Sequence, residues 1–516
     1  MTNMFRKYNI ARLAPSLLGL ALASVLASVV AGCAVGPDFQ RPAAPAGAGF
    51  TIEPLPAQVG GGDAGNVQQL AVNEDIPAQW WTLFHSPALN DLVREALTSN
   101  PTIDAAKAAL REANETTTAQ VGAYFPTVNG ELNPTRGRTA NVLSPVTADN
   151  TQYYTLHTAE LNVGFAPDVF GLNRRTVESL DAAAENQRFQ LEATRLTLAS
   201  NVVVAAIQEA SLRAQIAATR QLIETQRTVL DSYRKQLALG QVAQTDVLAQ
   251  ESQLAVNEAS LPPLDKQLAQ QRDALAALLG RPPNNEIAAT FELSNLTLPD
   301  ALPVSLPSRL VEQRPDVRAA EAQMHSAEAL VGVAIANRLP NIQLSANVGV
   351  EAATVASLFN SGAGFWGIAA TITQPIFDAG TLKHKQSAAE AAYDQTAAQY
   401  RSTVITAFQN VADALHAISA DADAQRSAQE SERVAARTLD IDRKQLALGN
   451  VTSVSVVIAE QTWLQAQVNL VTAQANRLSD SAALIQALGG GWWNEVASVT
   501  LPAPSARSSV TKNEGG

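Results

Sequence analysis

The heptapeptide "RKQLALG" occurs twice in this chain, at residues 234–240 and again at 443–449. Other segments of the two halves match in the same order and at nearly the same separation. These pairs are "NPTIDAA" (100–106) with "RPDVRAA" (314–320), and "APDVFG" (166–171) with "QPIFDAG" (374–380). Chance does not produce matches in this order. The chain therefore has an internal two-fold repeat of about 210 residues, and its fold has to contain the same elements twice.

Each half predicts the same order of elements. An Ala-rich helix comes first, and two strand-like segments joined by a loop follow it. A long helix of about 100 Å is next, and a shorter helix ends the half. Apolar residues recur every seven positions along the shorter helix, which indicates helices packed side by side over many turns. The predicted helices are 101–123, 172–239 and 244–280 in the first half, and 315–338, 381–448 and 453–488 in the second.

The repeated heptapeptide lies where the long helix of each half should end. Its last residues, Gly240 and Gly449, suit the left-handed conformation that follows many helices, so we expect them at the turns of two helical hairpins. Two adjacent prolines, Pro262 and Pro263, lie inside the second helix of the first hairpin. Because proline lacks an amide hydrogen and clashes with the preceding turn, we expect this helix to be kinked or broken there.

The strand-like segments alternate apolar and polar residues, as in "NIQLSANVGV" (341–350) and "WGIAATI" (366–372). A third such segment runs through 159–165, and the fourth, around Val128 and Leu132, shows a weaker alternation. Strands of about ten residues with this pattern suit an outer-membrane barrel, in which one face meets lipid and the other meets water. A small soluble sandwich is the alternative for strands considered alone.

Four strands cannot close a membrane barrel, because the smallest such barrels have about eight. Open edges in hydrocarbon would leave backbone groups unsatisfied at a cost of several kcal/mol each. We therefore expect copies of the chain to share one barrel. Two copies would give about eight strands with a filled interior, and three would give about twelve strands and a lumen.

The first residues predict export and lipid modification. Basic residues precede an apolar run, and residues 1–32 have the organisation of a signal peptide. The run ends in "VVAGC", which resembles a lipobox, and Cys33 is the single cysteine of the chain. We expect Cys33 to carry lipid and Ala34 to direct the protein to the outer membrane. An ordinary secretory peptide, or an N-terminal membrane helix, with an incidental thiol is the alternative.

The same features set the expected boundaries of the chain. A lipid-anchored Pro/Gly-rich segment occupies 33–75, and a largely disordered tail occupies 491–516. Between them lie the two repeats, each with a strand pair and a helical hairpin. The first repeat is 76–290, with strands at about 126–166 and a hairpin at about 172–280; the second is 291–490, with strands at about 340–375 and a hairpin at about 381–488.

Composition and motifs argue against several functions. The chain has 36 basic and 48 acidic residues, and this acidic balance argues against a nucleic-acid partner, which needs a basic surface. The five histidines are scattered without ligand spacing, and no nucleophile elbow or phosphate-binding glycine loop occurs. We therefore expect no catalytic, cofactor-binding or metal-binding residues and no enzyme activity. The tryptophan pairs at 80–81 and 492–493 lie near the ends of the mature chain, and we expect them to pack around its middle or to sit at an interface rather than to form a ligand site.

Several motifs resemble one family. They are "CAVGPDFQRP" (33–42), "WWTLFHSPALNDLVREALTSNP" (80–101), "APDVFGLNRR" (166–175), "LPSRLVEQRPDVRAAEAQM" (306–324) and "QPIFDAGTL" (374–382). They resemble the TolC/OprM-type outer-membrane factors, in particular the NodT-like efflux lipoproteins. The resemblance implies a mainly α homotrimer with a 12-stranded outer-membrane β-barrel and a 12-helix periplasmic tube. It also implies that a periplasmic adaptor and an inner-membrane pump, of the resistance-nodulation-division type, dock at the helical tips.

The resemblance further implies a gate at those tips. Thr245 and Asp246 match a Thr-Asp pair of the family on the first hairpin, and helix capping is an equally good role for them. The second tip departs from the family pattern, because Ser455 and Ile458 stand where relatives often carry acidic residues. Val451 and Leu446 also replace the Arg and Tyr that often partner the Asp. Leu, Val and Thr packing is therefore an alternative means of closing the second tip.

Three functions follow from these patterns. The first is a duct that exports drugs or other small toxic compounds across the outer membrane with an adaptor and a pump. The second is an outer-membrane duct for type I protein secretion, and the third is a non-channel periplasmic coiled-coil scaffold. The alternating strands favour a duct, because a scaffold would not need them.

Overall fold

A computed structural model describes the chain at residues 34–44, 49–54, 56–60, 67–138, 153–285 and 287–494. Cys33 and the predicted signal peptide lie outside these residues. The chain divides into two compact units, and each contains parts of both repeats. Unit 1 comprises residues 1–42, 108–188 and 319–402, and unit 2 comprises 43–107, 189–318 and 403–516. The two sequence repeats are therefore not two separate domains.

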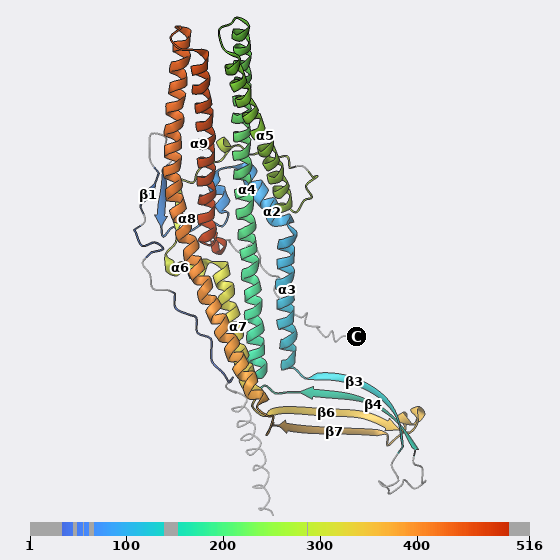
Figure 1. Cartoon of the computed structure of the whole chain (residues 1–516). Coiled ribbons are helices and arrows are strands. Elements are labelled where there is room, and N and C mark those ends of the chain that lie inside the picture. The colour runs from blue at the N-terminus through green and yellow to red at the C-terminus, as the bar shows by residue number, and fades with distance from the viewer. Residues whose placement is uncertain are drawn as a thin grey trace, which may run out of the picture. The chain divides into compact units, whose positions relative to one another are not determined.

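Unit 1 contains a four-stranded antiparallel sheet in the order β3-β4-β6-β7 (Figure 1). Its strands are β3 (Thr127–Arg138), β4 (Tyr153–Phe165), β6 (Asn341–Ala352) and β7 (Gly364–Thr373). β3 and β4 form a hairpin from the first repeat, and β6 and β7 form one from the second. The pairing of β4 with β6 joins the repeats. All the predicted strands are confirmed, including the weakly patterned β3.

The register puts one row of apolar residues from each of these strands on the same face. Val163 pairs with Val128 on one side and with Ala346 on the other, and Ala346 pairs with Ile368. This face is uncovered in the single chain: Trp366, Ile368 and Ile372 are 76%, 80% and 69% exposed. The exposed fractions are far above those of a sheet packed in a soluble core. The face therefore needs lipid or another covering layer.

Both repeats send a long helix away from the sheet. The first is α4 (Leu172–Ala238) and the second is α8 (Thr381–Ala447), each of 67 residues. Their first turns are capped in the same way. Asp168 accepts the amides of Asn173 and Arg174, and Asp378 accepts those of Gly380 and Leu382. The amides of Leu382 and Gly380 lower the pKa of Asp378. The Ala-rich helices are α3 (Pro101–Val121) and α7 (Pro315–Ala336).

Unit 2 contains the ends of two helical hairpins (Figure 1). α5 (Gln244–Leu278) follows α4, and α9 (Ser453–Ala487) follows α8. The turns are made as predicted, because Gly240 and Gly449 have φ of 71° and 75°. Of the two expected effects of the prolines, a kink or a break, the break does not occur, since α5 continues through Pro262 and Pro263. Both prolines are exposed, so the carbonyls that lose their amide partners can bond to water.

Shorter elements of unit 2 were not all expected. Within the segment predicted as Pro/Gly-rich, β1 (Gln58–Val59) pairs with β2 (Gln68–Val72), and β2 pairs in parallel with β5 (Ala301–Val304). Two short helices, α2 (Pro87–Ser99) and α6 (Pro307–Gln313), complete the unit with short 3₁₀ turns. These strands have two to five residues and carry no alternation for a sequence pattern to reveal.

The start of the predicted C-terminal tail is ordered. Trp492–Asn494 form a 3₁₀ turn at the start of the segment expected to be largely disordered. Trp492 Nε1 donates to the carbonyl of Gln313 over 2.6 Å, and Asn494 Nδ2 donates to that of Ile76 over 2.8 Å. Trp492 also packs edge-on against Phe189. These contacts hold the turn in place, and residues 495–516 lie outside the described part.

Helices in the described ranges do not include one that is both long and apolar enough to cross a membrane.

Candidate functional site

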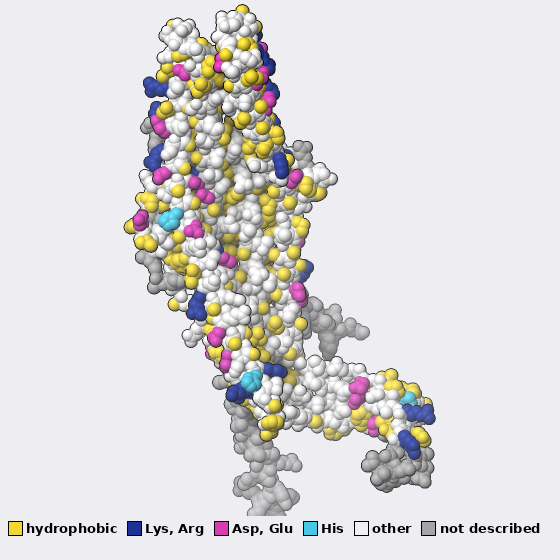
Figure 2. Space-filling model, viewed as in Figure 1, with side chains coloured by type: hydrophobic (Ala, Val, Ile, Leu, Met, Phe, Trp, Pro, Cys, Tyr) yellow, Lys and Arg dark blue, Asp and Glu magenta, His cyan; other side chains and the backbone are white. Residues whose placement is uncertain are grey.

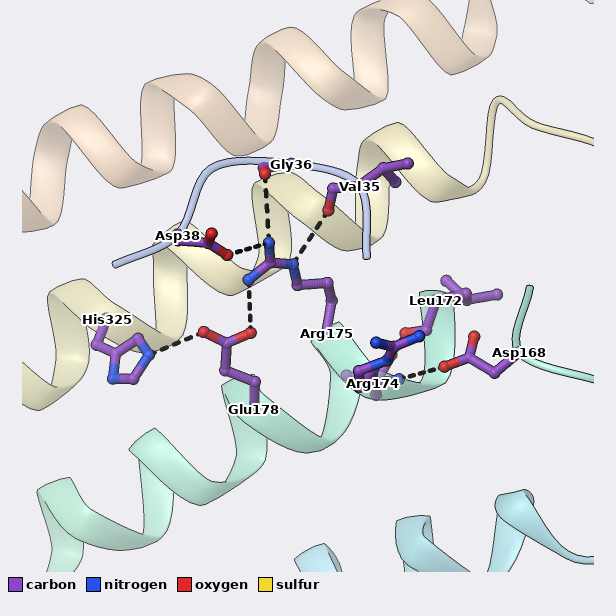
Figure 3. A network of polar contacts seen from close by, with 10 residues as sticks. Val35, Gly36, Asp38, Asp168, Leu172, Arg174, Arg175, Glu178 and His325 are labelled. Atoms are coloured by element: carbon purple, nitrogen blue, oxygen red, sulfur yellow. Dashed lines mark hydrogen bonds and ion pairs between the residues drawn. The ribbon is translucent and has the colours of Figure 1, made fainter. Parts of the chain in front are cut away.

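The residues that follow Cys33 are fastened to unit 1 by Arg175 (Figure 3). The Arg175 side chain is only 4% exposed. It donates to the carbonyls of Val35 and Gly36, and it forms ion pairs with Asp38 and Glu178 over 2.7 and 2.8 Å. The acceptors raise the pKa of Arg175 in spite of the opposing effect of its burial. We call residues 34–39 the N-terminal strap.

A second layer of contacts holds the strap. The Glu178 carboxylate lies 3.1 Å from His325 Nε2, and the His325 ring stacks on Phe39 with centroids 4.3 Å apart. A Cβ at Gly36 would lie 2.6 Å from the Cα of Gly332, so the strap approaches α7 too closely for any larger residue. In the sequence His325 is one of five scattered histidines, and no spacing links it to Phe39 or Glu178. The only indication of this network in the sequence is that Asp38 and Arg175 both lie in segments that resemble the family.

At the first hairpin tip, Thr245 and Asp246 are exposed at the start of α5. The N-cap is Ala243, so neither residue occupies it. Asp246 is the third helical residue, and its carboxylate accepts the Ala243 amide over 3.0 Å. This is half of a capping box, because the alanine side chain cannot return the bond. Burial raises the pKa of Tyr233 on α4, and the nearby Asp246 charge adds to the effect.

At the second tip, Ser455 and Ile458 line a groove of about 590 Å³ between α8 and α9. Thr452 is the N-cap of α9, and its Oγ1 lies 3.4 Å from Ser455 Oγ. The same groove is lined by Glu430 and Asp442 of α8. An acidic residue therefore does lie near the second tip, but it is Asp442 on α8; Glu430 lies about 28 Å farther along the helix from the turn at Gly449.

The two hairpins pack together near their tips through an apolar cluster. Its buried members come from both: Val229, Leu230, Tyr233, Val247 and Val457. On the surface of the first hairpin, three heptad-spaced arginines of α4 pair with carboxylates of α5. The pairs are Arg220–Asp265, Arg227–Glu258 and Arg234–Glu251, at 3.2, 2.8 and 2.7 Å. The second hairpin shows the matching pair Arg443–Glu460. Single exposed pairs add little stability, so the row mainly keeps the register of α4 on α5.

A buried arginine holds the small sheet of unit 2 against the hairpins. Arg477 of α9 is 2% exposed. It donates to the side chain of Gln68 on β2, to that of Gln425 on α8, and to the Val59 carbonyl of β1, over 3.0, 2.9 and 3.3 Å. Burial lowers the pKa of Arg477, and the Asp421 charge opposes this effect. No sequence pattern predicted this cluster, because its members are far apart along the chain.

Asp421 predicts a pH effect on stability. Burial, together with the hydrogen bond and repulsion from Asp480, raises its pKa to about 6, above the unfolded value of about 3.9. Its contribution to stability is therefore full below about pH 4 and is lost as the pH rises through about 6. We expect Asp421→Asn to raise the thermal unfolding midpoint at about pH 7.5 and to leave it unchanged near about pH 4. Asp423→Asn, an exposed change on the same helix, is the control; equal shifts at both pH values would contradict the prediction.

The polar face of the four-stranded sheet has its own side-chain network. Glu160 of β4 accepts from Asn162 over 3.2 Å and from Asn347 of β6 over 3.1 Å. A Cβ at Gly349 would lie 2.5 Å from the Ala159 carbonyl oxygen, so the backbone at this joint between the repeats requires glycine. Together with the apolar opposite face, this polar face gives the sheet one side for lipid and one for water.

The described part of the chain holds no group of three or more His, Cys, Asp or Glu arranged to bind a metal ion.

Comparisons with known proteins identify a family and several relatives that this chain resembles. The family model described as "Outer membrane efflux protein" matches residues 92–281 and 306–490. The pyoverdine export outer membrane protein OpmQ of Pseudomonas putida is 28% identical over 424 residues, which cover 81% of this chain and 89% of OpmQ. The cation efflux system protein CusC of Escherichia coli O6:H1 is 30% identical over 477 residues, covering 90% of this chain and 97% of CusC. The structure of the outer-membrane channel OprN superposes with a TM-score of 0.78 at 25% identity, over 89% of this chain and 100% of OprN.

Proposed function

The chain belongs to the outer membrane efflux protein family, and we propose that it forms the outer-membrane exit duct of a tripartite efflux system for drugs or other small toxic compounds. It is an outer-membrane protein with the mainly α fold of these channels. The observation that carries the proposal is the four-stranded sheet with one apolar face, one polar face and two open edges. Such a sheet suits a shared barrel whose apolar face meets lipid.

The assembly we propose is a homotrimer. β3 and β7 are edge strands in the single chain, and open edges in hydrocarbon are costly. Three chains with four strands each would close a barrel of about twelve strands around a lumen. The internal repeat suggests how the edges meet: within a chain, the last strand of the first repeat pairs with the first strand of the second. Between chains, β7 would pair in the same way with β3 of the next copy.

The register between copies follows from the repeat. The first strands of the two hairpins are offset by 214 residues (Thr127 to Asn341), and the second strands by 209 (Gly164 to Thr373). Moving the Val163–Ala346 pair by these offsets places Ile372 opposite Leu132 of the next copy. The same shift pairs Ile368 with Arg136 and Trp366 with Arg138. Every such pair has both members on the same face of the sheet, as a barrel requires.

The remaining partners are supported by the family alone. We expect a periplasmic adaptor and an inner-membrane pump, of the resistance-nodulation-division type, to dock at the hairpin tips near Asp246 and Ser455. Asp246 and Thr245 are our candidates for the gate, and Gly240 and Gly449 shape the turns that carry it. We propose that Cys33 is lipidated and anchors the chain to the outer membrane. The buried Arg175 supports this proposal, because it fixes the strap that begins at the next residue.

Accumulation of a fluorescent efflux substrate tests the function. A strain that lacks this chain is expected to retain dyes and small toxic compounds, and re-expression of the wild type should restore export. Re-expression without effect on any small molecule, together with loss of a protein from the medium, would favour type I secretion. If neither export changes while cell-envelope spacing does, the scaffold is the better account.

A further inference from the structure

Charged side chains of the four-stranded sheet separate completely by face. The acidic residues of these strands, Glu131, Glu160 and Glu351, lie on the polar face. The basic residues, Arg136 and Arg138, lie on the apolar face, because they continue the row of Val128 and Leu132 along β3. A charge on a lipid-facing surface is unfavourable at the centre of the bilayer and tolerated near its boundary. The position of the two arginines along the strand therefore matters.

The apolar band of this face ends before the arginines begin. On β6 it extends from Ile342 to Val350, about 27 Å along the strand at 3.4 Å per residue. At the tilt of about 40° that barrel strands have, this is about 21 Å along the membrane normal, near the band of about 25 Å that membrane barrels present to lipid. Leu132 lies in the same row as Val350, because both pair with Ala159. Arg136 and Arg138 follow by about 14 and 20 Å along β3. In the register between copies they lie beside Ile368 and Trp366 of the next copy, which belong to the apolar face. The two arginines are thus placed at the edge of the apolar band, where hydrocarbon gives way to headgroups, and at the end of the sheet away from the helices.

Aromatic residues accompany the two arginines. The Arg138 guanidinium lies over the ring of Tyr153, 5.6 Å from its centroid, and Tyr153 is 64% exposed. Both arginines are exposed, and Figure 2 shows dark-blue side chains at this end of the sheet. Tyrosine is enriched where a membrane protein passes from hydrocarbon to headgroups. Guanidinium groups bind phosphate through two parallel hydrogen bonds.

We propose that Arg136 and Arg138 form a binding site for the phosphate groups of anionic lipids in the outer leaflet of the membrane. This inference rests on the proposed function, which gives the sheet its place in the outer membrane. Closure of the barrel would bring Trp366 and Ile368 of the next copy beside the two arginines and complete the site. Three copies would carry three such sites around the barrel, a belt that fixes the depth of the sheet in the lipid.

Native mass spectrometry of the full-length protein in detergent tests the site, with phosphatidic acid as the probe and phosphatidylcholine as the reference lipid. The wild-type assembly is expected to retain phosphatidic acid, and Arg136→Gln/Arg138→Gln should weaken this binding about tenfold or more. Phosphatidylcholine is expected to bind both proteins equally weakly. Arg111→Gln/Arg437→Gln, which removes two exposed helical arginines, is the matched control and should leave the lipid bound.

A further variant and a competition with inorganic phosphate distinguish a lipid site from a site for free phosphate and from misfolding. Arg136→Lys/Arg138→Lys keeps the charge and should retain part of the binding. Binding by this variant would show that changes at these two positions do not by themselves unfold the site. Displacement of the lipid by millimolar inorganic phosphate would show a site for free phosphate and overturn the lipid site. Equal retention of phosphatidic acid by the wild type and the Gln variant would also overturn it. The same spectra report the oligomeric state, so failure of the trimer is distinguished from failure of the site.

Discussion

Oxidation of the double variant Leu132→Cys/Ile372→Cys is expected to link the chain into covalent trimers. The repeat offsets place these residues opposite each other on β3 and β7 of adjacent copies. Cα atoms of directly opposed residues in an antiparallel pair are about 4.5–5.5 Å apart, which a disulfide can bridge. A disulfide forms only if the register is right, so the expected change is from monomers to nearly complete trimers on a non-reducing gel.

Matched variants show whether the register itself is responsible. Asn133→Cys/Ile372→Cys puts the two thiols on opposite faces of the barrel and should remain unlinked, as should each single variant. The native Cys33 is common to all of them, so any linkage through it appears in every lane. Efficient linkage of Asn133→Cys with Ile372→Cys would contradict the register while keeping the assembly. Unlinked chains that run as monomers in every measurement would contradict the assembly itself.

Replacing Arg477 by Met is expected to release the small sheet of unit 2. The arginine donates to Gln68, Gln425 and the Val59 carbonyl from a buried position. Met fills a similar volume but leaves these acceptors without a donor, and each lost bond to a charged group costs about 1.5–3 kcal/mol. Part of this cost is offset, because the buried charge is no longer desolvated. We expect a net loss of about 3 kcal/mol, or about 100-fold faster hydrogen exchange in β1 and β2.

Hydrogen exchange followed by mass spectrometry measures this effect at residues 58–72. The control is Arg426→Met, an exposed arginine on α8 that pairs with Asp423. It should leave exchange in this segment unchanged. If Arg477→Met exchanges like the wild type, the small sheet is held by its apolar contacts, and the hydrogen bonds of Arg477 contribute little.

Sequence patterns were sufficient for the long elements of this fold. The heptad rows, the turn glycines and the match between the two repeats placed the ends of α4, α5, α8 and α9 within two residues of their observed positions. These signals are local, because each arises from neighbouring residues of one helix. The repeat supported these predictions, because the helices and strands predicted for one half had to match those predicted for the other. The prolines of α5 do not end the helix, because both are exposed and the carbonyls that lose their amide partners can bond to water.

The same patterns could not predict the side-chain clusters. Arg477 and Gln68 are 409 residues apart in sequence, and Arg175 and Asp38 are 137 apart. No periodicity links such pairs, and an isolated arginine in a sequence looks like a surface residue. Only the fold shows that Arg175 and Arg477 are buried and fully engaged. The gate residues Thr245, Asp246 and Ser455 stay predictions, because closure of the tips depends on neighbouring copies.

Single-channel conductance in a planar bilayer tests the central claim, that this chain forms a gated duct. We expect the purified wild type to give a small, mostly closed conductance, and Asp246→Ala to increase the open fraction. Asp231→Ala, an exposed change on the same hairpin, should behave like the wild type. A wild-type pore that Asp246→Ala leaves unaltered would make Asp246 a helix cap alone. Well-folded protein that conducts no ions in either form would contradict the duct.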